Sequence, residues 1–292
     1  MKTNDYGFET YLRERYALTM AKLYAREIGI YRGNCPGAGD AGFNGVMAYI
    51  GQLRNRYPNA GTVRRVLCAL KAYYQYLALT GQRNDNPAAS VRLRDPAPSD
   101  IQLQDLFTAS ELEQLLHKEE RYPVLAGRNR VLMGLLIYQG LQPRELEELR
   151  VPDIDLEAGT VRVRAQANTN GRTLSLKAAQ VLLILNYLQV IREQLLAGQQ
   201  SDRLLVGLRG SRFLAADIIK HVTSHYGSLF LPRKVSCRTI RASVIANLLK
   251  DGKELRAVQV FAGHKKISAT EKYRQDQVQA LHSIIQAWHP MK

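Results

Sequence analysis

The chain has 292 residues, of which 41 are lysine or arginine and 26 are aspartate or glutamate, giving a formal net charge of +15. Hydrophobic residues make up 46% and charged residues 23%, a composition that excludes collagen-like, disordered and membrane-spanning classes. The length predicts two domains, and the positive excess is typical of proteins that bind a polyanion such as nucleic acid.

The three cysteines, Cys35, Cys68 and Cys237, are widely spaced, with no Cys-x-x-Cys pair and no histidine cluster beside them. This spacing predicts neither a disulfide framework nor a metal site. The N-terminus is too polar for a signal peptide, and no run reaches the about 20 apolar residues of a membrane span. We therefore expect a cytoplasmic protein in a reducing compartment.

The first predicted domain, residues 1–95, is helical. Apolar spacing predicts a helix over residues 6–31, then a glycine-rich loop over 33–45, then two helices separated by a break at 57–59. The last of these helices ends near Gly81, a predicted C-cap.

Residues 37–42 within the loop match the G-x-G-x-x-G pattern of dinucleotide sites. No buried strand precedes them, and the acidic residue that such sites carry about 20 positions later is absent. We therefore interpret this segment as a flexible loop.

The stretch between Asp40 and Asp85 contains no acidic residue but six basic ones. A solvated helix face usually mixes both signs, so this single-sign run favours a nucleic-acid-binding face. The residues that we expect to contact DNA there are Arg54, Arg64, Arg65 and Lys71.

Prolines at positions 87, 96 and 98 can neither continue a helix nor join a central strand, which predicts an interdomain linker at residues 96–106. The second domain, 107–292, opens with Thr108 and Glu111 at the spacing of a capping box. It is predicted to be mostly helical, with one antiparallel strand pair whose members are 160–164 and 172–176, joined around Asn170-Gly171.

Charged and aromatic residues near the C-terminus form a candidate phosphate site. Arg238 and Arg241 lie one turn apart near the start of a predicted helix, and two such guanidiniums suit a bound phosphate. A predicted helix C-cap, Gly263, directly precedes His264, and Tyr273 follows a capping-box pattern that starts at Ser268. Taken singly, these residues are more often solvated or packed, whereas their combination favours chemistry.

The spacing of Arg241, Gly263-His264 and Tyr273 resembles the catalytic half of the tyrosine recombinases, the family of phage integrases and Xer-like resolvases. Residues 140–149, GLQPRELEEL, resemble the family's Gly-Leu-Arg-x-x-Glu-Leu-x-x-Leu segment, and residues 151–155 resemble the lead into its strand pair. The N-terminal half resembles the family's helical core-binding domain. The resemblance covers nearly the whole chain.

This resemblance implies a mainly α fold with a small antiparallel β-sheet, in which a helical, SAM-like core-binding domain and a catalytic domain clamp double-stranded DNA. It implies site-specific recombination or integration, with Tyr273 as the nucleophile that forms a 3′-phosphotyrosyl bond and releases a 5′-hydroxyl. Arg241, His264 and Arg238 would stabilise the transition state. The family needs neither ATP nor metal, so we expect no cofactor.

Three positions depart from the family pattern. Gln142 stands where the family has its first catalytic arginine, and either Arg144 in the opening turn or another basic residue could compensate. No lysine occurs between positions 118 and 177, where the family has a lysine that protonates the leaving oxygen. Arg172 is nearby, as a candidate DNA contact, but its guanidinium is a poor proton donor. Arg238 replaces a histidine or lysine.

These departures leave a second hypothesis open, a catalytically degenerate DNA-binding accessory protein of a recombination system. The family also implies a homotetramer on paired DNA sites, with a partner recombinase as a further option. An apolar stripe over residues 278–288 predicts a tail helix that docks either on a neighbouring protomer or on its own domain.

Overall fold

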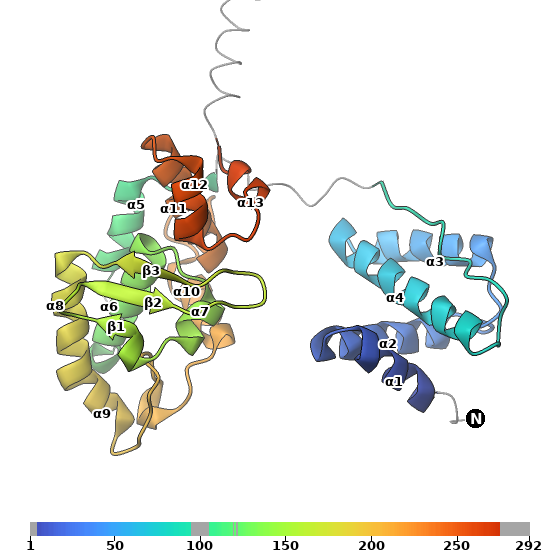
Figure 1. Ribbon diagram of the computed structural model, residues 1–292, viewed down its shortest axis with the longest axis horizontal. Helices are drawn as coiled ribbons and strands as arrows, with labels where there is room; N and C mark the ends of the chain where they lie inside the picture. Colours follow the sequence, from blue (N-terminus) through green and yellow to red (C-terminus); the bar gives the residue numbers. More distant parts are fainter. Residues whose placement is uncertain (1–4, 95–104, 119, 121, 275–292) are drawn as a thin grey trace, which may run out of the picture. The chain divides into compact units, whose positions relative to one another are not determined.

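The computed structural model describes residues 5–94, 105–118, 120 and 122–274, and the chain divides into two compact units, 1–100 and 101–292. Most of the predicted linker at 96–106 and the predicted tail after residue 274 lie outside the described residues. The first unit consists of helices, whereas the second combines helices with a small sheet (Figure 1).

The first unit is helical. The predicted helix at residues 6–31 is instead two helices, because the chain leaves helical geometry at Tyr16-Ala17. The helices are α1 (Asp5–Arg15), α2 (Leu18–Asn34), α3 (Phe43–Arg56) and α4 (Ala60–Leu79). Asn59 caps α4 by accepting from Gly61 N at 2.8 Å, and Gly81, two residues past its end, has a φ of +69°.

The glycine-rich loop between α2 and α3 is fastened to the rest of the first unit. The fully buried Tyr74 hydroxyl donates to Ala38 O at 2.8 Å and lies 2.7 Å from the hydroxyl of Tyr31. Arg83 donates to Gly39 O and to Ala41 O and lies over the ring of Tyr74. The prediction of a flexible loop is therefore wrong, because Tyr74 and Arg83 satisfy three of its carbonyls.

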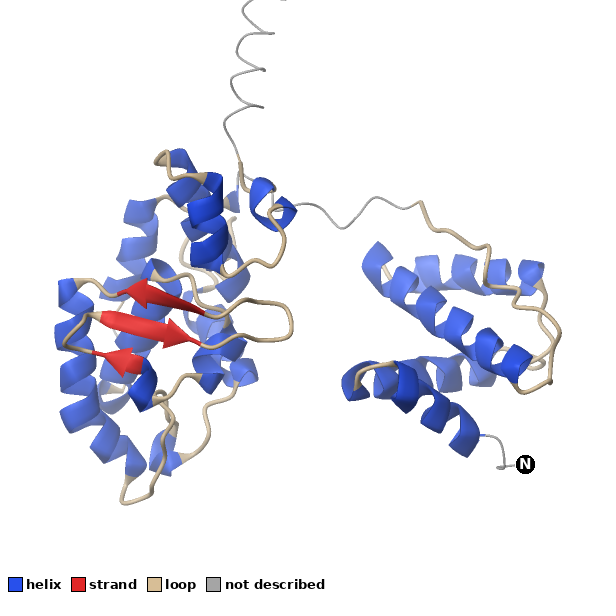
Figure 2. Ribbon diagram, viewed as in Figure 1, coloured by secondary structure: helices blue, strands red, loops and turns tan. Residues whose placement is uncertain are grey.

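The second unit packs helices around a small antiparallel sheet with strand order β1-β2-β3 (Figure 2). The predicted strand pair is confirmed, with Thr160 opposite Ser175 and Val163 opposite Arg172, and Ile154–Asp155 adds the third strand. The strands are β1 (Ile154–Asp155), β2 (Thr160–Val163) and β3 (Arg172–Ser175). This arrangement confirms the predicted fold class, mainly helical with a small antiparallel sheet.

The helices of the second unit are mostly short. They are α5 (Ala109–Gln114), α6 (Pro123–Tyr138), α7 (Pro143–Glu148), α8 (Ala178–Asn186), α9 (Arg192–Leu196), α10 (Ala215–Tyr226), α11 (Cys237–Lys250), α12 (Leu255–Ala262) and α13 (Ser268–Glu271). Single turns of other helical types lie at Leu115–His117, Val151–Asp153, Tyr187–Ile191 and Leu208–Gly210. None of the helices in the described parts of the chain is long and apolar enough to cross a bilayer.

Helix α6 supplies the centre of the second core, with Leu132, Met133, Leu135 and Leu136 fully buried. The predicted capping box at the start of α5 is confirmed, because Thr108 and Glu111 bond reciprocally to each other's backbone N–H. Arg233 also binds Glu111, and these hydrogen bonds lower the pKa of the Glu111 carboxyl to about 2.

Replacing Tyr74 with phenylalanine should destabilise the first unit. The substitution removes a buried hydroxyl that donates to Ala38 O and accepts from the Tyr31 hydroxyl, so we expect Tyr74→Phe to lower the free energy of unfolding by about 1–3 kcal/mol. Urea unfolding of the full chain, followed by circular dichroism, measures this. The matched control is Tyr16→Phe, whose ring packs on Tyr24 and which should change stability by less than about 0.5 kcal/mol. Equal effects of the two substitutions would contradict the prediction.

Candidate active site

Helix α11 places two arginines at one end of the second unit. Ser236 caps this helix by accepting from Thr239 N at 3.1 Å, which sets where its first turn begins. Arg238 and Arg241 follow within the first two turns. Arg238 is exposed, whereas Arg241 is buried, with 7% of its surface accessible.

The buried Arg241 guanidinium holds two other segments of the chain. One terminal nitrogen donates to Gly140 O, in the turn before α7, and the other donates to Ala262 O, at the end of α12. Burial lowers the pKa of Arg241, and the nearby carboxylate of Glu145 opposes this shift. Arg241 is therefore a charged side chain fixed in place by the backbone of two neighbouring elements.

His264 lies directly after the turn that ends α12. Gly263 has a φ of +68°, a conformation that glycine adopts without the steric penalty of a side chain. Gln259 donates to His264 O at 3.0 Å, and His264 Nδ1 lies 2.9 Å from the hydroxyl of Thr270 on α13. The backbone and ring of His264 are thus both held by residues near it in sequence.

The environment of His264 disfavours its charged form. Burial, followed by the positive charges of Arg241 and Arg172, lowers the pKa of His264 to about 4, and Glu145 acts in the opposite direction. The imidazole is therefore neutral at pH 7 and has one nitrogen that carries a proton.

Tyr273 completes the group predicted from the sequence. Its ring stacks on that of His264, with centroids 6.2 Å apart and an interplanar angle of 16°. Burial raises the pKa of the Tyr273 hydroxyl, while the charges of Arg241 and then Arg238 lower it. The structure thus brings together the four residues Arg238, Arg241, His264 and Tyr273.

The helix before Tyr273 does not begin as predicted. Ser268 is the first residue of α13 and not its cap, because the preceding Ile267 occupies the cap position with helical backbone angles. Ile267 O accepts from the backbone N–H of Glu271 at 3.1 Å. The predicted capping box at Ser268 is therefore wrong.

Gln142 caps helix α7, and Pro143 is its first residue. The backbone N–H of Gln142 donates to the Glu145 carboxylate at 2.9 Å. Arg144 is exposed, and no hydrogen bond or ion pair among the described residues links it to Arg241 or His264. Its compensation for Gln142 stays a prediction, because a guanidinium does not bond directly to another cation.

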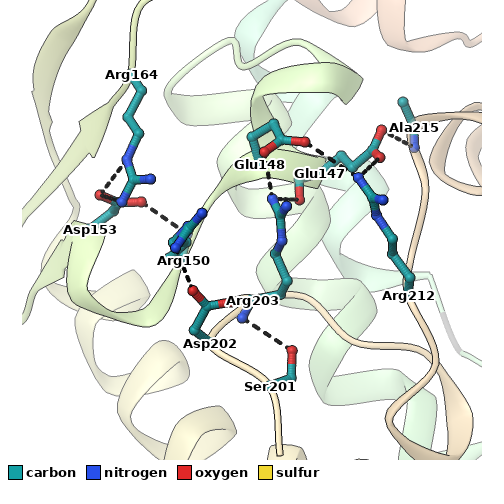
Figure 3. A network of polar contacts seen from close by, with 10 residues as sticks. All are labelled: Glu147, Glu148, Arg150, Asp153, Arg164, Ser201, Asp202, Arg203, Arg212 and Ala215. Carbon is teal, nitrogen blue, oxygen red and sulfur yellow. Dashed lines mark hydrogen bonds and ion pairs between the residues drawn. The ribbon is translucent and has the colours of Figure 1, made fainter.

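Ion pairs fix the outer side of α7 to the segment that precedes α10 (Figure 3). Glu147 pairs with Arg212 at 2.8 Å and accepts from Ala215 N, and Glu148 pairs with Arg203 at 2.7 Å. Single exposed pairs contribute little stability, but several of them acting on one short helix restrict its position. The same network continues to Arg150, Asp153, Arg164, Ser201 and Asp202.

Arg172 and Glu145 form a buried ion pair beside this site. Two nitrogens of Arg172 bind the two carboxylate oxygens of Glu145 at 2.8 and 3.0 Å, and the two side chains are 2% and 0% exposed. Burial alone would raise the pKa of Glu145, but hydrogen bonds from Arg172 reverse this and lower it. The prediction that Arg172 contacts DNA does not fit this burial.

Glu145 is the site residue that the sequence reasoning did not single out. It stands three residues after Gln142, a spacing at which a glutamate commonly bonds the backbone of a cap residue. That signal was present, but its partner Arg172 lies 27 positions away on another element. A pairing over that distance cannot be read from helix periodicity.

The loop between β2 and β3, where the family has its lysine, rests against the His264 segment. Asn170 N donates to Gly263 O at 2.8 Å, and Thr169 forms an isolated bridge with His264. A Cβ at position 263 would lie 2.6 Å from Arg172 Nη1 and 2.9 Å from Asn170 O. Gly263 is therefore required for close approach as well as for its backbone angle.

The predicted DNA-binding residues of the first unit fall into two groups. Arg54 and Arg64 are exposed. Arg65 and Lys71 are half-buried; Arg65 pairs with the buried carboxylate of Glu27 at 3.4 Å, and Lys71 donates to Ala89 O at 3.1 Å. The described residues hold no group of three or more histidine, cysteine or acidic side chains that could bind a metal ion.

Comparisons with known proteins place this arrangement in a family. Residues 105–280, more than half of the chain, match the phage integrase family. The tyrosine recombinase XerC of Myxococcus xanthus is 28% identical over 249 residues, which cover 84% of this chain and 81% of the relative. The tyrosine recombinase XerD of Staphylococcus aureus (strain Mu50 / ATCC 700699) is 24% identical over 245 residues, covering 84% and 82%.

Solved structures share the fold. The Tn1549 transposon integrase in complex with a circular intermediate DNA superposes with a TM-score of 0.72 at 15% identity, covering 97% of this chain and 98% of that one. A lambda integrase dimer bound to a core site gives 0.70 at 16% identity, covering 93% and 94%. The chain therefore belongs to the phage integrase family of tyrosine recombinases.

The histidine of this site should titrate well below the usual range. Because burial and two neighbouring arginines disfavour the imidazolium, we expect a titration midpoint near 4 for His264. Proton NMR of the histidine ring signals against pH measures it, and His264→Gln identifies the signal by removing it. Between this midpoint and the unfolded value of about 6.5 the unfolded state binds more protons, so stability should fall as the pH is lowered. A midpoint at or above 6.5 would contradict the proposed environment.

Proposed function

We propose that this protein is a site-specific DNA recombinase that cuts and rejoins strands through a covalent bond between Tyr273 and a DNA 3′-phosphate. The observation that carries the proposal is the stacking of Tyr273 on His264, with Arg241 and Arg238 acting on the same hydroxyl. Family membership and the DNA-bound state of the similar integrase structures support double-stranded DNA as the substrate.

The reaction exchanges one phosphodiester for another. The Tyr273 oxygen attacks phosphorus, the bond to the 5′-oxygen breaks, the phenol loses a proton and the leaving oxygen gains one. A 5′-hydroxyl of another strand then attacks the phosphotyrosine and restores the phenol. Because each step replaces one P–O bond with another, the bond energy is kept for rejoining.

The described cations face the charge that develops on the phosphate oxygens. Arg241 has five N–H donors and uses its two terminal nitrogens on Gly140 O and Ala262 O, so further donors on the same fixed group can bind the phosphate. When the Thr270 hydroxyl donates to His264 Nδ1, the neutral ring carries its proton on Nε2 and can donate it to an oxygen. Preorganised donors of this kind favour the transition state over the ground state.

The departing 5′-oxygen lacks an evident proton donor on the β2–β3 loop. Residues 164–171 contain no lysine, and the guanidinium of the neighbouring Arg172 is bound to Glu145. General acid catalysis contributes about 10²–10⁴-fold where it operates. We therefore place the rate limitation at the leaving group, and a 5′-sulfur leaving group of lower pKa should relieve it.

Tyr273→Phe should abolish covalent attachment to DNA. The substrate is duplex DNA from the sequences flanking this protein's own gene, nicked so that the leaving strand is lost, and adducts are counted on denaturing gels. The control Tyr138→Phe changes the last residue of α6, whose hydroxyl lies 3.5 Å from Glu113 and whose ring contacts Lys177, and it should retain attachment. Gln142→Arg should accelerate it, because one preorganised donor is worth about 10²–10³ in rate.

The alternative, an accessory DNA-binding protein, predicts another result of the same assay. It takes its support from Gln142 and the missing lysine, and the comparisons favour the recombinase over it. If flanking DNA is bound tightly but neither the wild type nor Gln142→Arg forms any adduct, the accessory function replaces the recombinase.

DNA binding should depend on salt through the exposed arginines of the first unit. Each phosphate contact adds about 0.9 to the slope of log K against log salt, so Arg54→Ala/Arg64→Ala should reduce the slope by about 1.8. Fluorescence anisotropy at several salt concentrations measures it. Arg13→Ala is the control, because Arg13 lies on α1, outside the acid-free stretch that predicts the binding face, and its loss should leave the slope unchanged. An unchanged slope in the double variant would remove both arginines from the interface.

Assembly and location are part of the same proposal. Three predictions stay open: that the two units clamp DNA, that a homotetramer forms on paired sites, and that a partner recombinase takes part. The tail that would join protomers lies outside the described residues. Acting on chromosomal or element DNA would place the protein in the bacterial cytoplasm or nucleoid.

A further inference from the structure

The buried pair of Arg172 and Glu145 joins three parts of the candidate active site. Arg172 belongs to β3 and Glu145 to α7. Arg172 Nη1 also lies so close to Gly263 that a Cβ there would approach it to 2.6 Å. The pair therefore connects the start of α7, the strand that follows the lysine-free loop, and the turn that carries His264.

The guanidinium of Arg172 lies beside the position where the family has its first arginine. One carboxylate oxygen of Glu145 accepts both from Gln142 N at 2.9 Å and from Arg172 Nη2 at 3.0 Å. Two donors on one oxygen cannot be more than about 5.9 Å apart at these distances. Position 142 has no cationic side chain, but the guanidinium of Arg172 lies next to its backbone.

The position of the Arg172 guanidinium matters because Glu145 carries a buried negative charge. A buried carboxylate with no partner is strongly unfavourable, and beside a phosphate site it would also repel the substrate. Glu145 acts electrostatically on both Arg241 and His264, so its charge reaches the reacting group. Gln142 is neutral and cannot offset it, whereas the two hydrogen bonds from Arg172 do.

We propose that Arg172 is a positioning residue that offsets the charge of Glu145 from β3, and that it thereby allows the site to work without an arginine at position 142. This inference rests on the proposed recombinase function. Arg172 is buried and acts through Glu145 and Gly263, so it does not itself touch the DNA.

The first test is Arg172→Gln in the full chain. A displacement of about 1 Å near reacting groups lowers rates about 100-fold, so we expect the rate of adduct formation on the nicked substrate to fall by about 10–100-fold. Gln142→Arg should accelerate Arg172→Gln by a larger factor than it accelerates the wild type, because only in that background does it also return a missing cation to Glu145. Equal factors in the two backgrounds would overturn the proposal.

The His264 titration provides a readout that does not need DNA cleavage. The groups that act on this imidazole are Arg241 and Arg172, which lower its pKa, Glu145, which raises it, and the Thr270 hydroxyl bonded to Nδ1. Removing Arg172 should move the midpoint upward from about 4. An unmoved midpoint would overturn the proposal, whereas the absence of any wild-type adduct would refute only the recombinase function.

Arg164→Gln is the matched control, since Arg164 also pairs with a fully buried carboxylate, that of Asp153, at 3.0 Å. It should leave the His264 midpoint and the adduct rate unchanged even where it lowers thermal stability. An equal effect on both readouts would show a purely structural role.

If Arg172→Gln does not fold, Glu145→Gln/Arg172→Gln removes both charges and leaves no unpaired ion. Replacing both partners of a buried pair is often tolerated, so this variant should fold and keep its adduct rate within about tenfold. A folded double variant without adduct would overturn the role assigned to Arg172.

Discussion

The candidate site depends on one buried carboxylate. Glu145 accepts hydrogen bonds from the backbone of Gln142 and from both terminal nitrogens of Arg172, and its charge acts on Arg241 and His264. A carboxylate this buried is tolerated only when its oxygens are fully bonded. The bonding of Glu145 therefore requires one arrangement of three segments: the start of α7, the first residue of β3 and the turn after α12.

Two further sets of contacts hold the same segments in place. Arg241 bonds the carbonyls of Gly140 and Ala262, which ties α11 to the turn before α7 and to the end of α12. Ion pairs of Glu147 and Glu148 fix the outer side of α7 (Figure 3). The short helix α7 would be marginal by itself, since helical nucleation is unfavourable, and these tertiary contacts determine where it lies.

The electrostatics of the site suit the binding of negative charge better than the transfer of protons. Clustered arginines and burial keep His264 neutral at pH 7, so it can donate a hydrogen bond but is a poor store of a proton. Arg241 and then Arg238 act on the Tyr273 hydroxyl against the effect of burial. The proposed Tyr273 nucleophile would benefit from this field, while the neighbouring loop offers no lysine to protonate the leaving oxygen.

The sequence alone determined the local features, because helix caps and side-chain periodicity are local properties. These features are the helical character of both units, the capping box at Thr108, the β2–β3 pair, and the spacing of Arg241, His264 and Tyr273. It could not show that Arg172 is buried against Glu145, or that Ser268 does not cap its helix. Only the tertiary structure decided these, because the burial of a charge depends on partners that lie far apart in the chain and meet only when the fold brings them together.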